Sequence, residues 1–239
     1  LFAQAPEAVP RPLDLDSLLA RLAAADAART AALQRYSSLR RYSLQNRRFR
    51  TTAEMIVRMT YQHPGTKTFE VLSEQGSGAV RKRVLRKIVD AEIEAASRET
   101  RSSTRITPQN YSFRLLAPTL DRGRPCYVLE ITPKTPSRFL IRGRIWIDAG
   151  DFAIARIEGA PARNPSLWVR RTAFVHTYEK AGRFWLPARN HSQTEAHVFG
   201  PTEITIEYSD YRIQEDATAA ASVSDPAAEP SHARSGSQP

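Results

Sequence analysis

With 239 residues, 41% of them hydrophobic, the chain is long enough to bury one sizeable core. Its 35 Lys and Arg residues outnumber its 25 Asp and Glu residues, and the resulting net charge of +10 favours contact with anionic surfaces. The single cysteine, Cys126, excludes an internal disulfide framework, and no stretch approaches the ~20 apolar residues that a membrane-spanning helix needs. The arginines are scattered over nearly every predicted strand, which argues against nucleic acid as a partner.

The first residues indicate export. Leu1 to Ala5 resembles the end of the apolar segment of a secretory signal, and Ala3 and Ala5 fit the small-x-small rule for cleavage. Cleavage after Ala3 is an alternative because Pro6 would be a poor first residue, and an ordinary frayed terminus is another interpretation. If export holds, we expect a soluble periplasmic protein in which residues 1–13 are a signal-peptide remnant and lead-in.

A helix is predicted next. Asp14 or Asp16 can cap it, and it runs to about Gln34. Leucines among the alanines give it one apolar stripe, which consists of Leu15, Leu18, Leu19, Leu22 and Leu33. Such a stripe is typical of a helix that packs on a sheet or on another helix.

The pattern between Leu39 and Leu72 changes to the period of strands. Met55, Val57 and Met59 alternate with polar residues, which is typical of a half-buried strand. His63-Pro64-Gly65-Thr66 then predicts a turn into the next strand.

A second helix is predicted from Gly78 to about Arg101, with Ser77 placed to cap it. Its first turns are basic, an order that opposes the helix dipole: Arg81, Lys82, Arg83, Arg86 and Lys87. This run is either a solvated helical face or a basic patch that faces an anionic partner.

Strands about ten residues apart are predicted from Asn110 to Ile213. Two-residue loops at the hairpin signals would fix the pairing of the flanking residues. An Ala149-Gly150 loop would pair Ile147 with Phe152 and Ile145 with Ile154, and an Ala181-Gly182 loop would pair Tyr178 with Trp185. Residues 214–239 are rich in Ala, Ser and Pro and lack aromatic residues, which predicts a disordered tail.

No catalytic motif is found, so we expect no enzyme, no catalytic residue and no cofactor. His191, Glu195 and His197 share one face of a strand, but the two histidines would lie roughly 20 Å apart, and we expect no metal site. Asp148 and Asp151 could be an acid-base pair, although a role in their turn is favoured. Cys126 is expected to be a buried small hydrophobe.

The late strands have a heavy aromatic load, which comes from Trp146, Trp168, Trp185, Phe139, Phe174 and Phe184. One interpretation is a packed core. The other is that a strongly curved sheet leaves part of this lining open as a ligand cavity.

The order of these features resembles the LolA-like outer-membrane lipoprotein-sorting superfamily, which includes the LolB receptor and RseB-type sensors. The resemblance covers about Asp14 to Ile213 and rests on five segments: GRIWID (143–148), ARIEG (155–159), PSLW (165–168), GRFWLP (182–187) and ITIEYSDY (204–211). These segments are similar to an uncharacterised branch of the superfamily rather than to the lipoprotein carrier itself.

The resemblance implies an α+β fold, in which residues 14–213 form an incomplete antiparallel β-barrel, a strongly curved meander sheet. An N-terminal helix and an inserted helix would cover its concave side, which would hold acyl chains. The candidate lining residues are Met55, Val57, Met59, Ile145, Ile147, Phe152, Ile154, Trp168, Phe174 and Trp185. The superfamily's lid-locking arginine cannot be assigned to one of the many arginines of this sequence.

The implied function is that of a monomeric periplasmic carrier or binding protein for lipoprotein acyl chains or lipids. Its basic surface would make transient contact with the membrane. The alternative is a sensor or regulatory binding module of RseB type that contacts an envelope protein partner.

Overall fold

The computed structural model describes residues 9–96, 102–164, 169–197 and 200–215. Its helical elements are α1 (Leu15–Ala32), α2 (Gly78–Val80), the π-helical segment η1 (Arg81–Leu85) and α3 (Arg86–Ala96). Its strands are β1 (Leu33–Asn46), β2 (Thr51–Gln62), β3 (Thr66–Gly76), β4 (Tyr111–Asp121), β5 (Arg124–Pro133), β6 (Ile141–Asp148), β7 (Ile154–Pro161), β8 (Val169–Ala181), β9 (Phe184–Ala196) and β10 (Gly200–Glu215).

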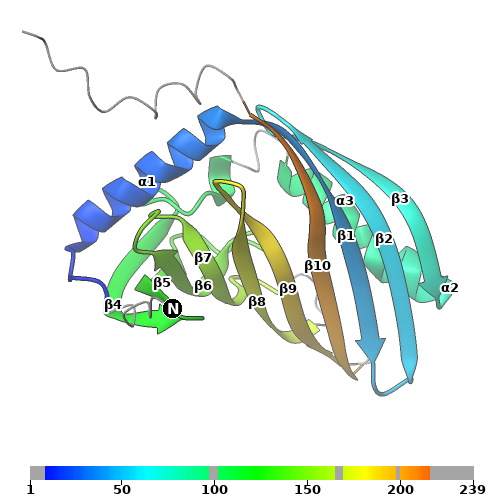
Figure 1. The fold of residues 1–239 in the computed structure, drawn as a ribbon. Helices are drawn as coiled ribbons and strands as arrows, with labels where there is room; N and C mark the ends of the chain where they lie inside the picture. Colours follow the sequence, from blue (N-terminus) through cyan, green and yellow to red (C-terminus); the bar gives the residue numbers. More distant parts are fainter. Residues whose placement is uncertain (1–8, 97–101, 165–168, 198–199, 216–239) are drawn as a thin grey trace, which may run out of the picture.

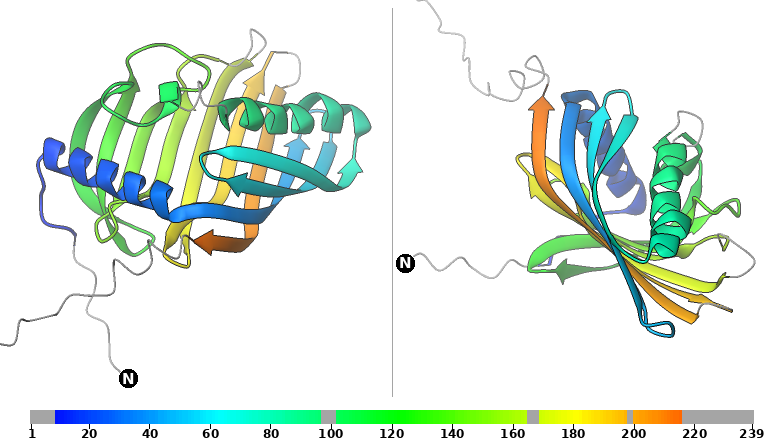
Figure 2. Two further views of the ribbon diagram at one scale, coloured as in Figure 1. Left: turned by 90° about the horizontal axis from the view of Figure 1, so that it is seen from above. Right: turned by 90° about the vertical axis from the view of Figure 1, so that its right-hand side faces the viewer.

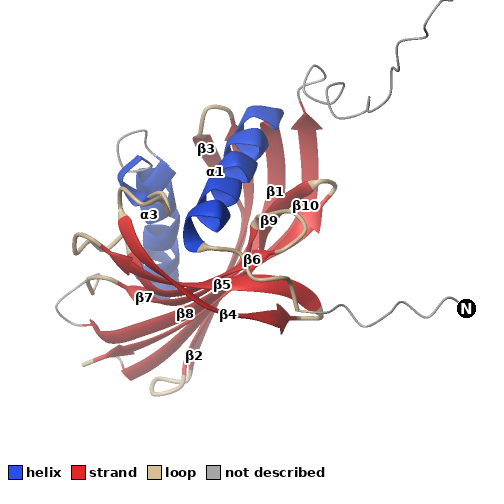
Figure 3. Ribbon diagram, turned by 90° about the vertical axis from the view of Figure 1, so that its left-hand side faces the viewer, coloured by secondary structure: helices blue, strands red, loops and turns tan. Residues whose placement is uncertain are grey.

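The strands form one antiparallel sheet in the order β3-β2-β1-β10-β9-β8-β7-β6-β5-β4. The first strand therefore pairs with the last, while β3 and β4 are the two free edges. The sheet curls strongly without closing, and α1 and α3 lie on its concave side (Figures 1, 2 and 3). The predicted incomplete barrel, with one helix before the strands and one inserted after the third, is confirmed.

Helix α1 begins where its cap was predicted. The Asp14 carboxylate accepts a hydrogen bond of 2.8 Å from the Ser17 N–H. The helix ends at Ala32, slightly earlier than expected, and β1 starts at once with Leu33 rather than near Leu39. The reason is burial, since Leu33 and Tyr36 pack beside Met59 on the concave side.

The inserted helical segment begins at its predicted cap, because the Ser77 Oγ accepts a hydrogen bond from the Val80 N–H. In its basic run, Arg81 and Arg86 both form ion pairs with Glu74 of β3, at 3.2 and 3.0 Å. Part of the predicted basic patch is thus paired with the sheet edge. Helix α3 is described as far as Ala96, and residues 97–101 lie outside the described part of the chain.

The predicted register of the β6–β7 hairpin was wrong. Ile147 pairs with Ile154 and Ile145 with Ile157, because the loop is longer than two residues. The Asp148 carboxylate accepts hydrogen bonds from the backbone N–H groups of Gly150 (3.1 Å) and Asp151 (2.9 Å), which stabilises this wider turn.

The predicted pairing of Tyr178 with Trp185 was also wrong. The loop is Gly182-Arg183, so Lys180 pairs with Trp185 and Tyr178 with Pro187. A β-bulge at Ala188 of β9 shifts the register only beyond Tyr178.

The ends of the chain, residues 1–8 and 216–239, lie outside the described residues, and so does the predicted tail beyond β10. Among the residues that are described, no helix is long and apolar enough to span a membrane.

Candidate functional site

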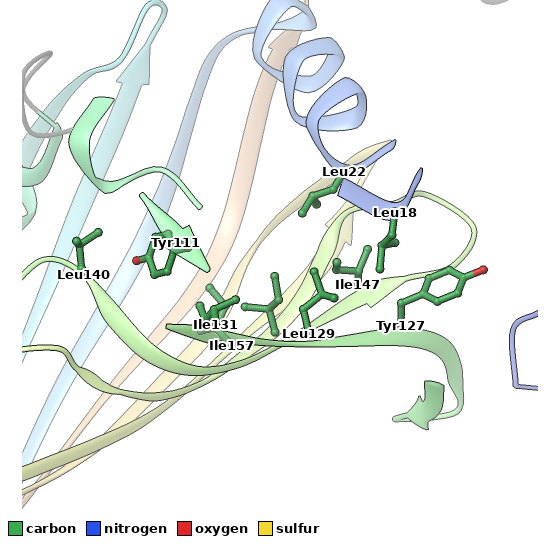
Figure 4. Close-up of a cluster of buried hydrophobic side chains, with 10 residues drawn as sticks. Leu18, Leu22, Tyr111, Tyr127, Leu129, Ile131, Leu140, Ile147 and Ile157 are labelled. Carbon is green, nitrogen blue, oxygen red and sulfur yellow. The ribbon is translucent and has the colours of Figure 1, made fainter. Parts of the chain in front are cut away.

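Three apolar clusters occupy the concave side of the sheet. In the first, Leu18 and Leu22 of α1 pack on inward side chains of β4 to β7 (Figure 4). In the second, Leu85 of η1 and Val89 of α3 pack on β1, β2 and β10. The third lies where α1 passes into β1 and includes Met59. Each helix therefore covers a different part of one concave apolar surface.

Most of the predicted lining residues lie in these clusters. Met55 and Val57 belong to the α3 cluster, Met59 to the third cluster, and Ile145 and Ile147 to the α1 cluster, and all five are fully buried. The half-buried members, packed against the α1 cluster, are Phe152, Ile154 and Phe174.

The two tryptophans of the predicted lining differ from the other residues. Trp185 is in none of the three clusters, and its indole Nε1 donates a hydrogen bond of 2.8 Å to Asp151 while the Arg124 guanidinium lies 5.1 Å from its ring. Trp168 lies outside the described residues.

A polar group lies among these apolar clusters, and we call it the central belt: Ser38, Arg40 and Tyr42 of β1, Glu92 of α3, His176 of β8 and Tyr208 of β10. The Arg40 guanidinium donates a hydrogen bond to Glu92, and the Tyr42 hydroxyl donates one of 3.0 Å to the other carboxylate oxygen. The Arg40 side chain is only 3% exposed and that of Glu92 24%. One ion pair thus joins α3 to the strand beneath it.

Aromatic rings surround the buried guanidinium. The Arg40 carbon Cζ lies 5.3 Å from the centre of the Phe69 ring and 5.1 Å from that of Tyr208. Burial disfavours the charged form of Arg40, but the negative charge of Glu92 outweighs this effect of burial. The pKa of Arg40 is therefore raised above its ordinary value. Burial and the negative charge of Glu92 also raise the pKa of Tyr42. The belt therefore contains a charged Arg40 and a neutral Tyr42.

Three buried polar atoms of the belt have no hydrogen-bond partner among the residues that the structure describes: Ser38 Oγ, Arg40 Nε and His176 Nε2. The His176 ring stacks on Tyr178, with centroids 4.5 Å apart, and on Tyr208 at 5.9 Å. Burial lowers the pKa of His176 to about 4, so the ring is neutral at pH 7.

Sequence reasoning did not single out Arg40, although a signal was present. Arg40 occupies an inward position of β1 in a row with Tyr36, Ser38, Tyr42 and Leu44, all of them buried. A charged residue in such a row needs a buried partner. That partner, Glu92, lies 52 residues away on the inserted helix, where the sequence pattern shows only one of several late glutamates.

The other candidates have structural roles. Asp148 is 1% exposed, and the bonds it accepts from the Gly150 and Asp151 N–H groups confirm its role in the turn. The Asp151 carboxylate instead binds the Trp185 indole and Lys180. Cys126 is fully buried, as predicted. His191 contacts the Thr205 hydroxyl at 3.0 Å, and among the described residues no three His, Cys, Asp or Glu side chains are grouped as metal ligands.

Two pockets lie on the convex face of the sheet. The larger, about 620 Å³, is lined by outward side chains of β1 and β2, such as Arg35 and Arg58, and by β10 near a bulge where Asp210 has φ of 56°. The smaller, about 420 Å³, lies near the β1–β2 turn and is lined mainly by polar residues. Buried inward residues also line these pockets, Ser38 in the larger and Leu44 and Ala53 of the second cluster in the smaller.

No protein-family model matches the sequence, and a search of curated proteins found no match. The chain is similar to a solved structure from Vibrio parahaemolyticus described as an outer membrane lipoprotein-sorting protein domain, with a TM-score of 0.44, 12% identity, and coverage of 84% of this chain and 94% of the other. It is also similar to a DUF1329 family protein from Desulfovibrio piger, with a TM-score of 0.43, 14% identity, and coverage of 83% of this chain and 92% of the other. A LolA superfamily protein from Nitrosomonas europaea is similar with a TM-score of 0.40, 12% identity, and coverage of 87% and 96%. These are similarities of fold at low sequence identity.

Proposed function

We propose that the protein is a periplasmic carrier that binds the acyl chain of a lipoprotein or lipid on its concave face, beneath a movable α3. The observation that supports this most strongly is the pairing of buried Arg40 with Glu92 on that helix. An apolar pair of similar size would stabilise such a contact as well or better, so a buried ion pair is better explained as a switch than as a source of stability.

The attachment of α3 is limited. Its buried apolar contact with the sheet is Val89, next to Leu85 of η1. Ile88 is partly buried there, and Ile93, one turn beyond Val89, is 46% exposed. A π-helical stretch, η1, directly precedes α3, a feature that is frequent at functional sites. Release of the helix would therefore require loss of the Arg40–Glu92 pair, of the Arg86–Glu74 pair at the sheet edge and of a few apolar contacts.

Release of α3 would uncover apolar side chains of β1 and β2, among them Tyr42, Leu44, Met55 and Val57. Acyl chains need such a dry apolar surface that can open, and Met55 offers pliable lining. In this proposal Arg40 is the arginine that holds the lid closed. The excess of basic residues would favour transient contact with an anionic membrane surface.

Native mass spectrometry of the protein purified from its own envelope, followed by transfer of the bound lipid to acceptor vesicles, tests the proposal. Phe174 and Ala173 offer a matched pair, because they are neighbours on opposite faces of β8 and only Phe174 packs toward the concave clusters. Phe174→Gln should lower lipid occupancy severalfold, while Ala173→Gln should leave it unchanged.

Bound lipid without transfer to vesicles would favour a sensor role over a carrier. A protein that never contains lipid, or equal lipid loss in the two variants, would contradict binding on the concave face.

A further inference from the structure

Two of the three unpartnered atoms of the central belt are hydrogen-bond donors on β1. Ser38 and Arg40 are two residues apart on β1 and therefore share the concave face, where each leaves a buried atom able to donate a hydrogen bond. His176 adds Nε2, also buried and without a partner in the described part of the chain. This Nε2 carries the proton in the tautomer whose Nδ1 accepts from the Tyr178 hydroxyl. Buried polar atoms without partners are rare and costly in folded proteins, so three in one belt need an explanation.

Glu92 shows which group the belt accepts. Its two carboxylate oxygens take the Arg40 guanidinium and the Tyr42 hydroxyl, yet it belongs to the inserted helix and not to the sheet. If α3 moves away, Glu92 leaves with it. A buried positive charge and the donors of Ser38 and Tyr42 then remain on the sheet without a negative partner, which is an unfavourable state.

Apolar surface borders the belt on both sides. The α3 cluster lies on β1, β2 and β10, and the α1 cluster extends to Phe174 and Tyr178 on β8. Half-buried rings of Phe69 and Tyr208 lie against Arg40 itself. A ligand in contact with the belt would thus place a charged group at Arg40 and apolar chain against its neighbours.

We propose that the concave face selects amphiphiles with an oxyanion head, a carboxylate or a phosphate, which replaces Glu92 on Arg40 and gains Ser38 and His176 as further partners. This inference rests on the proposed function and specifies the class of lipid. The anionic head lies inside the barrel, and the acyl chain extends over the adjacent apolar surface. Glu92 then acts as a competitor that occupies the head-group position while the site is empty.

The test compares dodecanoate, dodecyl phosphate and dodecanol, which share one chain length, by calorimetric titration at pH 7.5 below their aggregation limits. The wild-type protein should bind the two anionic probes about tenfold more tightly than dodecanol, the size expected for a hydrogen bond to a charged group. Acetate and inorganic phosphate, at the same concentrations, should not displace them.

Glu92→Gln provides the decisive variant, because it removes the competing charge and leaves Arg40 in place. A looser α3 would strengthen binding of every probe alike, so the quantity to compare is the ratio of anionic to neutral affinity. That ratio should rise about tenfold in Glu92→Gln. It should stay at the wild-type value in Glu94→Gln, a control on the same helix whose partner, Arg138, is exposed. In Arg40→Met the preference for anions should disappear.

The outcomes separate the two proposals. If all three amphiphiles bind equally and the ratio is the same in Glu92→Gln, the head-group inference is wrong while the acyl-chain site stands. If no amphiphile binds, the proposed function itself fails. If inorganic phosphate binds as tightly as dodecyl phosphate, the belt is a site for free anions and the inference is overturned.

Discussion

The Glu92→Gln substitution should weaken the docking of α3 far more than the matched change at Glu94. Glu92 neutralises Arg40, whose side chain is 3% exposed, whereas the pair of Glu94 with Arg138 is about half exposed on both sides. Loss of one partner of a buried ion pair costs roughly 3 to 5 kcal/mol. Glutamine keeps part of the hydrogen bonding and Glu92 is partly exposed, so we expect about 1 to 3 kcal/mol. Glu94→Gln should cost less than about 1 kcal/mol.

Two measurements test this difference between Glu92→Gln and Glu94→Gln. Equilibrium unfolding in urea gives the free energy of unfolding of each variant, and amide hydrogen exchange reports on α3 itself. In Glu92→Gln the amides of α3 should exchange faster, while those of β5 and β6 under α1 should keep their protection. Equal and small losses in the two variants, with unchanged exchange in α3, would refute the conclusion that the ion pair with Arg40 fastens this helix.

Three further predictions concern other parts of the molecule. Gly143→Ala should strongly destabilise the fold in thermal unfolding, because the new Cβ would lie 2.0 Å from the Glu158 carbonyl oxygen. Gly78→Ala is the control and should be nearly neutral, because the nearest atom to its new Cβ lies 3.6 Å away. Burial lowers the pKa of His176 to about 4, so between pH 6.5 and 4 the unfolded chain binds more protons than the folded chain. The free energy of unfolding should therefore fall by up to about 3 kcal/mol as the pH drops through this window. The fall should be smaller in His176→Phe. Burial raises the pKa of the Cys126 thiol to about 11, so a thiol reagent at pH 8 should label it only after unfolding; fast labelling of the native protein would contradict its burial.

Local patterns were enough to predict much of the fold. The Asp14 and Ser77 caps, the inward row of Met55, Val57 and Met59, and the inserted helix were all visible as spacing along the chain. These features depend on neighbouring residues, and the structure confirms them. The register of the hairpins was not predictable in this way, because the length of the β6–β7 loop depends on bonds that the Asp148 side chain makes inside it.

The centre of the candidate site depends on contacts between distant segments. Arg40 was one of many arginines until the pairing of β1 with β10 placed it beside Tyr208, and until α3 placed Glu92 above it. His176 joins them from β8, beyond β9 and β10 in the sheet. Sequence pattern identified the apolar concave face, but only the folded sheet brings together the polar residues within it.

The most direct test of acyl-chain binding on the concave face is photolabelling with a long-chain fatty acid that carries a photoreactive group near its chain end. The labelled residues are then mapped by peptide mass spectrometry. We predict labels on concave side chains such as Met55, Phe174 and Tyr178, and more label when Glu92 is replaced by glutamine. Label confined to the convex pocket around Arg35 and Arg58, or no specific label, would contradict the proposal.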